Sequence, residues 1–353
     1  MRTSRSTQGD KVRKASLSNA PRIAIIGCGA IAESYHLPAI AKHPSVLDRL
    51  VLVDTDEARA QEVASKFDVH NYVCDYHEVL GQVDGAIVAV PHRLHYPISM
   101  DFLMKGVHVL CEKPLAESSL EAKELVAQAK KSGVTISVNN TRRLFPAYSR
   151  VKELILNQTI GDLVSIKYVD GEIFQWPTAS GFYFKKSSPT GVLLDRGAHG
   201  LDTICWWLGG KPKVVSSEND SFGGVEGVAL LRLEHDGCSV KIKLSWLSKL
   251  QNTYRIVGEL GMIEGGIEEW ARVTIAYESG RTERIKLSSK ERVYNDFGNK
   301  IVANFIDVVS KGARPLVPAS EVILSIELIE ECYRTARRFR MPWYEALEVL
   351  DGN

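Results

Sequence analysis

The chain has 353 residues, of which 44% are hydrophobic and 25% are charged, and its formal net charge at pH 7 is +1. This composition is typical of a globular protein large enough for two domains, and the balanced charge argues against nucleic acid as a partner. No apolar run reaches the length of about 18 residues that a membrane-spanning helix needs, so we expect no membrane partner.

Residues 1–21 are rich in serine and basic residues and contain no hydrophobic core, so they do not form a secretory signal. Their apolar residues are too few for the amphipathic helix of a mitochondrial transit peptide, and we expect a disordered tail instead. The 6 cysteines are scattered, without a C-x-x-C pair or metal-finger spacing. Most lie in apolar stretches, which is typical of reduced core residues in a cytosolic protein.

From residue 22 onward, short apolar runs alternate with segments whose apolar residues recur every three or four positions. The runs lie at 22–27, 50–54, 69–73, 84–90, 108–113 and 135–140. Continuous apolar runs separated by helical patterns predict a parallel sheet that is covered on both faces. The sequence therefore predicts an α/β fold that begins with a doubly wound Rossmann domain over residues 22–140.

After residue 160 the pattern changes, because apolar and polar residues alternate. The alternating runs lie at 163–173, 213–220, 228–235, 239–246, 253–259 and 272–278, and helical patterns lie at 192–208, 293–310 and 318–339. Alternation predicts strands with one face toward solvent. We therefore predict that residues 141–353 form an α+β domain with a large, mostly antiparallel sheet.

The first predicted strand runs directly into GCGAIA, a G-x-G-x-x-A pattern that begins at Gly27. Gly27 permits a tight turn, Gly29 lets a pyrophosphate approach the backbone, and Ala32 lets helix and strand pack closely. Ala30 and Ile31 open the next helix, whose first N–H groups can bind phosphate. The alternative is a glycine-rich turn that binds nothing.

Asp54 ends the second predicted strand, at about the distance from the glycine pattern where a carboxylate binds the ribose hydroxyls of a dinucleotide. A carboxylate there repels a 2′-phosphate, and the following Thr55 and Asp56 supply no cation to hold one. NAD is therefore favoured as the cofactor over NADP. Arg59 lies close enough in the sequence to keep NADP open.

Polar residues also follow the later predicted strands. Ligands in such sheets bind outside the carboxyl ends of the strands, so these residues are candidates for cofactor binding. They are His92 and His95 after the fourth strand, together with the adjacent Pro91; Glu112 and Lys113 after the fifth; and Arg143 after the sixth. Pro114 follows Lys113 directly and restricts the backbone there.

The predicted helix over residues 192–208 carries Asp195, His199 and Asp202 at positions i, i+4 and i+7, which form one polar stripe. Such a stripe indicates a ligand. The alternative is an acidic residue that favours the start of the helix, with a hydrogen-bonded histidine above it.

Three aromatic residues, Trp176, Tyr183 and Phe184, lie just before this helix. They predict an aromatic wall against which a sugar ring stacks. A position in the core or in an interface is the alternative, and the residues alone do not separate the two.

Together, GCGAIA, AVPHRLH, HVLCEKPL and LLDRGAHGLD resemble the glucose–fructose oxidoreductase/inositol dehydrogenase/MocA (Gfo/Idh/MocA) family, from residue 22 to about residue 340. The resemblance implies that the lysine of E-K-P, Lys113, and the pair Asp195 and His199 face the nicotinamide ring. It also implies that the Lys113–Pro114 bond can be cis. Many members carry a longer glycine run before the helix, where this chain has Pro189-Thr190-Gly191, and this departure puts the substrate loop in doubt.

The chemistry that this resemblance implies assigns a role to each of the three residues. His199 accepts the proton of a secondary alcohol, because imidazole titrates near neutral pH. Asp195 orients the substrate or tunes His199, and Lys113 stabilises the charge on the substrate oxygen. We also expect Trp176 to contact the substrate. No metal site is expected, because no cluster of His or Cys has metal-ligand spacing.

We therefore expect a cytosolic, NAD(P)-dependent dehydrogenase or reductase that acts on a secondary hydroxyl or keto group of a sugar, polyol or nucleotide sugar. Two alternatives remain open: an NAD-dependent glycosidase of the same fold, and a non-catalytic dinucleotide sensor. A homodimer or homotetramer is expected, since relatives bury the solvent-facing side of such a sheet.

Overall fold

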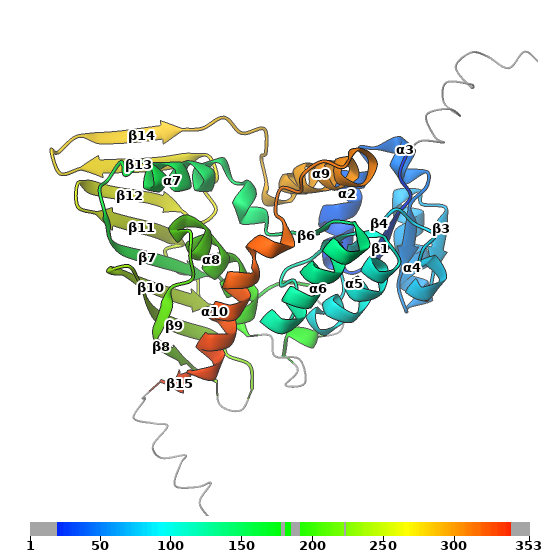
Figure 1. The fold of residues 1–353 in the computed structure, drawn as a ribbon, viewed down its shortest axis with the longest axis horizontal. Coiled ribbons are helices and arrows are strands. Elements are labelled where there is room, and N and C mark those ends of the chain that lie inside the picture. The colour runs from blue at the N-terminus through cyan, green and yellow to red at the C-terminus, as the bar shows by residue number, and fades with distance from the viewer. Residues whose placement is uncertain (1–19, 178–180, 185–190, 222–223, 340–353) are drawn as a thin grey trace, which may run out of the picture. The chain divides into compact units, whose positions relative to one another are not determined.

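The computed structural model describes residues 20–177, 181–184, 191–221 and 224–339. The tail predicted over residues 1–21, apart from its last two residues, lies outside this part, as do Pro189 and Thr190. The chain forms two compact units (Figure 1). Among the described residues, unit 1 contains 20–144, Pro177 and Ser289–Ile326, and unit 2 contains Phe145–Trp176, the described residues of 181–288, and 327–339. The predicted domain limits follow sequence continuity, whereas packing groups Ser289–Ile326 with unit 1.

Unit 1 contains a six-stranded sheet in the order β3-β2-β1-β4-β5-β6, and every neighbouring pair of strands is parallel. The strands are β1 (Ile23–Ile26), β2 (Val51–Val53), β3 (Asn71–Val73), β4 (Gly85–Val88), β5 (His108–Cys111) and β6 (Ile136–Val138). Each lies within a predicted apolar run. The strand order reverses between β1 and β4, which is the point where a doubly wound sheet binds a dinucleotide. The predicted Rossmann fold is confirmed.

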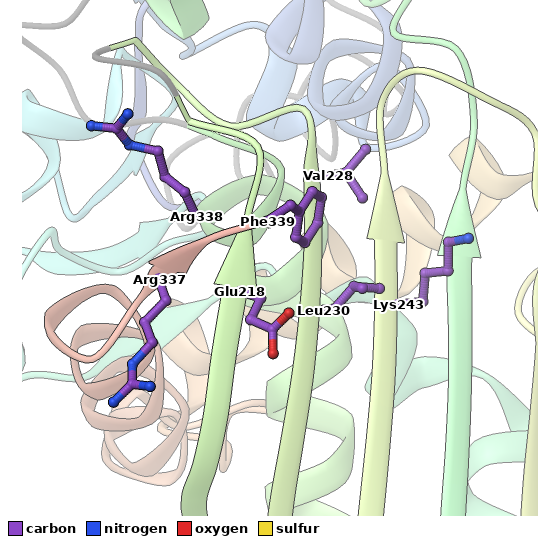
Figure 2. Close-up of a pocket in the computed structure, with 7 residues that line it drawn as sticks. All are labelled: Glu218, Val228, Leu230, Lys243, Arg337, Arg338 and Phe339. Atoms are coloured by element: carbon purple, nitrogen blue, oxygen red, sulfur yellow. The ribbon is translucent and has the colours of Figure 1, made fainter. Parts of the chain in front are cut away.

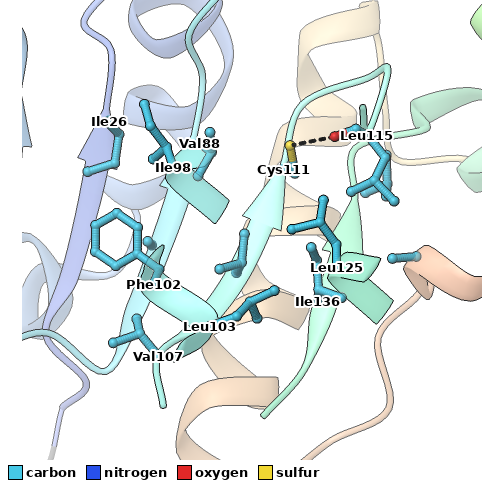
Figure 3. Packing of buried hydrophobic residues seen from close by; sticks show 14 of the residues in the cluster. Ile26, Val88, Ile98, Phe102, Leu103, Val107, Cys111, Leu115, Leu125 and Ile136 are labelled. Atoms are coloured by element: carbon cyan, nitrogen blue, oxygen red, sulfur yellow. Dashed lines mark hydrogen bonds between the residues drawn. The ribbon is translucent and has the colours of Figure 1, made fainter. Parts of the chain in front are cut away.

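Helices cover both faces of this sheet, which is why its strands are apolar on both sides. They include α2 (Leu37–Ile40), α3 (Pro44–Leu47), α4 (Glu57–Phe67), α5 (His95–Met104), α6 (Ser119–Ser132) and α9 (Phe297–Lys311). Phe102 and Leu103 of α5 pack with Val88 and Cys111 on one face (Figure 3). On the other face, Phe305 of α9 packs in the cluster that contains the alternate residues of β1.

Shorter helical turns connect these elements. They are the π-helix η1 (Ala32–His36) and the 3-10 turns η2 (Tyr76–Val79), η3 (His92–Leu94), η4 (Thr141–Leu144), η5 (Phe182–Phe184), η6 (Tyr294–Asp296) and η7 (Ala319–Glu321). Local sequence sets the ends of the longer helices. In α6, Ser118 and Glu121 form a reciprocal capping box, and Gly133 ends the helix in the left-handed region.

Unit 2 contains a nine-stranded sheet in the order β14-β13-β12-β11-β7-β10-β9-β8-β15. The strands are β7 (Leu163–Gly171), β8 (Lys213–Asn219), β9 (Val228–His235), β10 (Cys238–Ser245), β11 (Thr253–Gly258), β12 (Gly261–Gly266), β13 (Arg272–Tyr277), β14 (Thr282–Lys286) and β15 (Arg337–Arg338). The pairs β7/β10 and β8/β15 are parallel, and the other pairs are antiparallel. The predicted large, mostly antiparallel sheet is confirmed.

Two helices, α7 (Pro146–Leu156) and α8 (Val192–Leu208), lie against one face of this sheet (Figure 1). In β10, Val240, Ile242 and Leu244 point toward the buried side, whereas Lys241 and Lys243 are exposed. This strict alternation is the pattern from which the strand is predicted.

Some predicted elements differ from the observed ones. α8 begins and ends where the helical pattern predicts. In contrast, α7, β12 and β14 are absent from the prediction, and the helix predicted over 318–339 is shorter, because α10 (Ile323–Arg334) lies between η7 and β15. The sequence GMIEGG of β12 contains three glycines, which favour strands weakly, and pairing with β11 and β13 holds it in the sheet.

Candidate cofactor site and candidate catalytic helix

The glycine turn after β1 has the geometry that a dinucleotide requires. Gly27 has φ of +94°, and a Cβ atom added there would lie 2.4 Å from the carbonyl oxygen of Ala89. Its N–H donates to Val53 O at 2.7 Å. A Cβ atom added at Gly29 would meet nothing within 4 Å, so the backbone faces open space there. These residues fit a pyrophosphate that lies directly on the backbone.

Ala30 and Ile31 begin the helical segment after this turn, as predicted, and the helix takes π geometry over Ala32–His36. Ala32 is fully buried, in agreement with its expected role in close packing. Single π turns inside helices occur frequently at functional sites.

Asp54 lies directly after β2 and holds the glycine turn. Its Oδ2 accepts the N–H of Cys28 at 2.8 Å, and its Oδ1 accepts the N–H of Asp56 at 3.0 Å. Each carboxylate oxygen keeps a further acceptor site, so Asp54 fits the ribose hydroxyls of NAD. Burial and then the charge of Asp54 raise the pKa of the Cys28 thiol to about 12, so this cysteine is an uncharged packing residue.

Glu112, at the end of β5, lies in a buried network of hydrogen bonds. Its Oε1 lies 2.7 Å from His36 Nε2 and accepts Asn139 Nδ2 at 2.7 Å. The Tyr35 hydroxyl donates to Asn139 Oδ1 at 3.3 Å, which extends the network. Burial by itself raises the pKa of Glu112, but His36, Asn139 and Lys113 together outweigh it and hold the pKa below its usual value. Glu112 is therefore an ionised side chain that links β5 to its neighbours.

The backbone after β5 is held by His95. Its Nδ1 lies 2.6 Å from Pro114 O, and its Nε2 lies 2.8 Å from Val90 O. The peptide bond that precedes Pro114, between Lys113 and Pro114, is cis, as the resemblance allows. Burial lowers the pKa of His95, and the two carbonyl contacts oppose this shift. His95 thus ties the end of β4 to the segment that carries Lys113, which is itself half-buried.

Three other predicted cofactor residues lie on the same unit. Pro91 precedes η3, and His92 is buried within it. Burial, followed by the charges of His95 and Lys113, holds the pKa of His92 well below its usual range. Arg143 Nη1 donates to Glu321 Oε2 at 2.7 Å, and its Nη2 donates to the backbone oxygen of Glu321 at 3.0 Å. This contact gives Arg143 a structural role that the sequence does not indicate.

In unit 2, Glu226 fixes the start of α8. Its backbone oxygen accepts the N–H of Val192 at 2.9 Å, and its side-chain Oε1 accepts the N–H of Leu193 at 3.0 Å and the hydroxyl of Tyr333 at 2.8 Å. Farther along the helix, Arg196 Nη1 donates to the buried Asp170 Oδ1 of β7 at 2.5 Å. Two buried carboxylates therefore anchor α8 to the rest of the unit.

Asp195 and His199 lie one turn apart on α8, and both are half-buried. Asp202, the third member of the predicted stripe, is only 1% exposed, so the accessible stripe consists of the first two. Asp195 Oδ2 accepts the indole N–H of Trp246 at 3.0 Å. A ring nitrogen directed at a carboxylate in this way holds the carboxylate in one orientation.

Trp246 belongs to an aromatic cluster with Phe174, Tyr183 and Phe184. The ring centroids of Phe174 and Trp246 are 4.8 Å apart, and those of Phe174 and Phe184 are 5.1 Å apart. Trp246 and Tyr183 are buried, whereas Phe184 is 54% exposed. Trp176, which is 42% exposed, is not among the ring contacts described for this region. Tyr183 and Phe184 therefore lie in one aromatic cluster, without a described ring contact from Trp176.

Several of these residues escape sequence reasoning. Trp246 ends a predicted strand, but its partner Asp195 lies 51 positions away. Glu226 lies in a segment without a recognisable pattern, and His36 lies on the buried side of a helix. Only their distant partners give them a role, and no local spacing indicates it.

A separate pocket lies on the sheet of unit 2 (Figure 2). Its lining consists of Glu218, Val228, Leu230, Lys243, Arg337, Arg338 and Phe339. None of these is a predicted site residue.

Across the described parts of both units, no group of three or more His, Cys, Asp or Glu side chains is placed to hold a metal ion. Likewise, none of the described helices is long and apolar enough to cross a membrane.

Comparison with known proteins identifies the family. Residues 21–140 match a family model described as "Oxidoreductase family, NAD-binding Rossmann fold", and residues 148–264 match the GFO/IDH/MocA C-terminal domain. The chain belongs to the Gfo/Idh/MocA family of oxidoreductases. The family predicted from sequence is thereby confirmed, as is the prediction that the protein is an enzyme.

Individual relatives of this Gfo/Idh/MocA protein are distant but match most of its length. The trans-1,2-dihydrobenzene-1,2-diol dehydrogenase of Mus musculus is 28% identical over 331 residues, which cover 88% of this chain and 96% of that protein. KijD10, a 3-ketoreductase from Actinomadura kijaniata, has a TM-score of 0.78 at 22% identity, over 92% of this chain and 100% of that one. Levoglucosan dehydrogenase has a TM-score of 0.77 at 17% identity, over 89% and 96%. These structural likenesses confirm the fold.

The cofactor of this Gfo/Idh/MocA enzyme is a nicotinamide dinucleotide, since the matched family domain is NAD-binding. The residues that would hold it in unit 1 are the open backbone at Gly29, the start of the helix at Ala30 and the carboxylate of Asp54. When bound, the nicotinamide supplies the hydride acceptor or donor of the reaction.

Proposed function

We propose that this Gfo/Idh/MocA enzyme is a dehydrogenase or reductase that interconverts a secondary hydroxyl and a ketone on a sugar, polyol or nucleotide sugar. The observation that carries the proposal is the arrangement on α8. A carboxylate and an imidazole lie one turn apart and half-buried, and the carboxylate accepts the indole N–H of Trp246. A carboxylate held in this way beside an exposed aromatic ring suits a cyclic substrate with both hydroxyl groups and an apolar ring face.

In this proposal His199 accepts the hydroxyl proton of the substrate while the adjacent carbon loses hydride, and it returns the proton in the reverse direction. Asp195 accepts a hydrogen bond from a second substrate hydroxyl or from protonated His199. Lys113 stabilises the negative charge that develops on the substrate oxygen. The contact of His95 with Pro114 O restricts the backbone next to Lys113, and so limits the positions of its ammonium group.

The aromatic cluster supports the choice of substrate class. Phe184 is 54% exposed beside the buried Trp246, so it offers a ring face on which a sugar or a cyclic polyol can stack. The names of two relatives agree with this choice. The mouse relative is named for a cyclic diol, and levoglucosan dehydrogenase has been crystallised in complex with NADH and levoglucosan. Trp176 remains a proposed substrate contact, and its exposure leaves its ring accessible.

The first experiment is a screen of polyols, sugars and nucleotide sugars for NADH formation. With the best substrate, Trp246→Phe keeps the ring and removes the N–H that Asp195 accepts. It should lower kcat/KM by about tenfold, because a hydrogen bond to a charged group contributes about 1.5–3 kcal/mol. Trp206→Phe is a matched control on α8, since the ring of Trp206 contacts Lys152 at 4.6 Å instead.

Lys113→Ala separates the proposal from its alternatives. Turnover should fall by a factor of about 100 or more while NAD affinity stays within about threefold. A sensor would show no turnover with any substrate in the screen. A glycosidase would release phenol from aryl glycosides with catalytic NAD and no net NADH. If Lys113→Ala retains full turnover, the role of Lys113 is wrong.

We also propose that the chain assembles as a homodimer or homotetramer in the cytosol. The solvent-facing side of the unit 2 sheet exposes Leu230 beside charged residues, and all 6 cysteines are free thiols, as is usual in a reducing compartment. Register aligns Arg232, Lys241, Lys167 and Arg255 in one row across neighbouring strands. Arg255 already contacts Glu264 of the next strand. Because like charges side by side repel, we propose that a partner surface supplies further carboxylates to this row, so association should weaken as salt rises. Sedimentation at two salt concentrations tests this.

A further inference from the structure

The geometry points to Glu33 as a residue that makes the nucleotide site of this enzyme select NAD over NADP. Glu33 does so by holding two cations, Arg59 and Lys66, that would otherwise bind a 2′-phosphate. The inference rests on the NAD-binding domain and is independent of the substrate proposed above.

Arg59 lies beside the carboxylate expected to bind the ribose. It is in the first turn of α4, and its Nε donates to the backbone oxygen of Cys28 at 2.8 Å. The N–H of the same Cys28 donates to Asp54 Oδ2 at 2.8 Å. Asp54 and Arg59 therefore bind the N–H and the carbonyl oxygen of the same residue, Cys28, in the glycine turn. An arginine in this neighbourhood is the residue that Rossmann domains use to bind the 2′-phosphate of NADP.

The guanidinium of Arg59 already has acidic partners. Its Nη2 donates to Glu33 Oε2, and its Nη1 donates to Glu62 Oε2 at 3.0 Å. Lys66 Nζ lies 2.5 Å from the other oxygen of Glu33. The hydrogen bonds from Lys66 and Arg59 lower the pKa of Glu33, so this carboxylate is ionised at neutral pH.

The two acidic partners of Arg59 are not equivalent. The side chain of Glu33 is 23% exposed and bridges both cations, whereas that of Glu62 is 67% exposed and contacts only Arg59 among the described ion pairs. Partly buried, bridged contacts are screened less by solvent than exposed ones. Glu33 is therefore the stronger restraint on the guanidinium.

A 2′-phosphate would enter this cluster unfavourably. It adds a charge of about −1.5 to −2 next to the carboxylates of Asp54 and Glu33. Arg59 can bind it bidentately only after leaving Glu33, so the attraction is offset by the loss of an existing ion pair. NAD, which carries a hydroxyl at this position, meets neither cost. The preference for NAD over NADP is the difference between the affinities for the two cofactors, and Glu33 contributes to this difference in addition to Asp54.

The test measures the dissociation constants of NAD and NADP by calorimetry, with full-length wild-type protein and four variants. E33Q keeps the size of the side chain and removes its charge. It should raise the affinity for NADP relative to NAD by about tenfold, because Arg59 and Lys66 become available. E62Q is the matched control and should change this ratio by less than about twofold. In E33Q/R59L most of the gain should be lost, because only Lys66 remains to bind the phosphate.

Two results with the E33Q variants would overturn the inference. One is an unchanged NADP-to-NAD ratio in E33Q; the other is a gain that persists fully in E33Q/R59L. R59L alone provides an independent check that does not depend on the folding of E33Q. If Glu33 withholds Arg59 from the phosphate, R59L leaves the ratio within about twofold of wild type. A severalfold loss of NADP affinity relative to NAD in R59L would mean that Arg59 already binds the phosphate, and would refute the proposal.

Discussion

Replacing Glu226 by alanine tests whether a single buried carboxylate holds the helix that carries Asp195 and His199. Glu226 is 4% exposed, and its side chain accepts the N–H of Leu193 and the hydroxyl of Tyr333. A Cβ atom added at Gly191 would lie only 1.9 Å from the Glu226 carboxyl group, so the carboxylate fills the space at the start of α8. Alanine removes the oxygen that accepts both hydrogen bonds and leaves the backbone contact with Val192 in place.

The size of the effect follows from the groups left behind. Leu193 is fully buried, and an unsatisfied buried N–H costs about 1–3 kcal/mol. A negative charge near the first turn of a helix contributes about 0.3–1 kcal/mol more. Burial of the carboxylate reduces the stability that these interactions contribute. It disfavours the charged form and raises the pKa of Glu226, although the side chain accepts hydrogen bonds. We expect Glu226→Ala to lower the free energy of unfolding by about 2–3 kcal/mol.

Urea unfolding and amide hydrogen exchange measure this loss. Exchange at Leu193 and the next residues of α8 should accelerate, and kcat should fall with it, because Asp195 is in the first turn of the helix. Glu268→Ala, at an exposed position, is the control and should stay within about 0.5 kcal/mol of wild type. Unchanged exchange at Leu193 in Glu226→Ala would refute the reasoning.

Three further predictions concern the same two units. First, the pKa of Glu226 is raised, so its contribution to stability is fully present below the ordinary carboxyl pKa of 4.5 and is lost as pH rises through the folded-state pKa. Wild type should therefore lose stability relative to Glu226→Gln over that pH range. A difference in urea midpoints that stays constant with pH would contradict this prediction. Second, Gly27→Ala should destabilise unit 1 by about 1–3 kcal/mol and weaken NAD binding, because residue 27 has φ of +94° and its new Cβ atom would lie 2.4 Å from Ala89 O. An unchanged melting temperature and an unchanged NAD dissociation constant, both measured by calorimetry, would argue against a tight turn. Third, His95→Leu should lower kcat more than it raises KM, since it frees the segment around Pro114, whereas an effect on melting temperature alone would limit His95 to a structural role.

The order of elements in this protein is largely visible in its sequence. The six apolar runs contain the six strands of the Rossmann sheet, and the 3.6-residue period places α8 at its observed bounds. Such periods are readable because they record, residue by residue, which side of an element is removed from water. The prediction fails for α7, β12 and β14. The glycines of β12 form a strand only because β11 and β13 pair with them on both sides.

The candidate site divides in the same way. The sequence by itself makes Gly27, Asp54 and the pair on α8 candidates, because turn conformation and helical spacing are local properties, whereas the role of Lys113 comes from the family resemblance. Only the tertiary structure decides which partners these residues have: Trp246 for Asp195, Glu226 for the start of α8, and Glu33 for Arg59. A hydrogen bond or an ion pair between elements depends on strand register and helix packing, which bring together groups distant in the sequence and which no local period specifies.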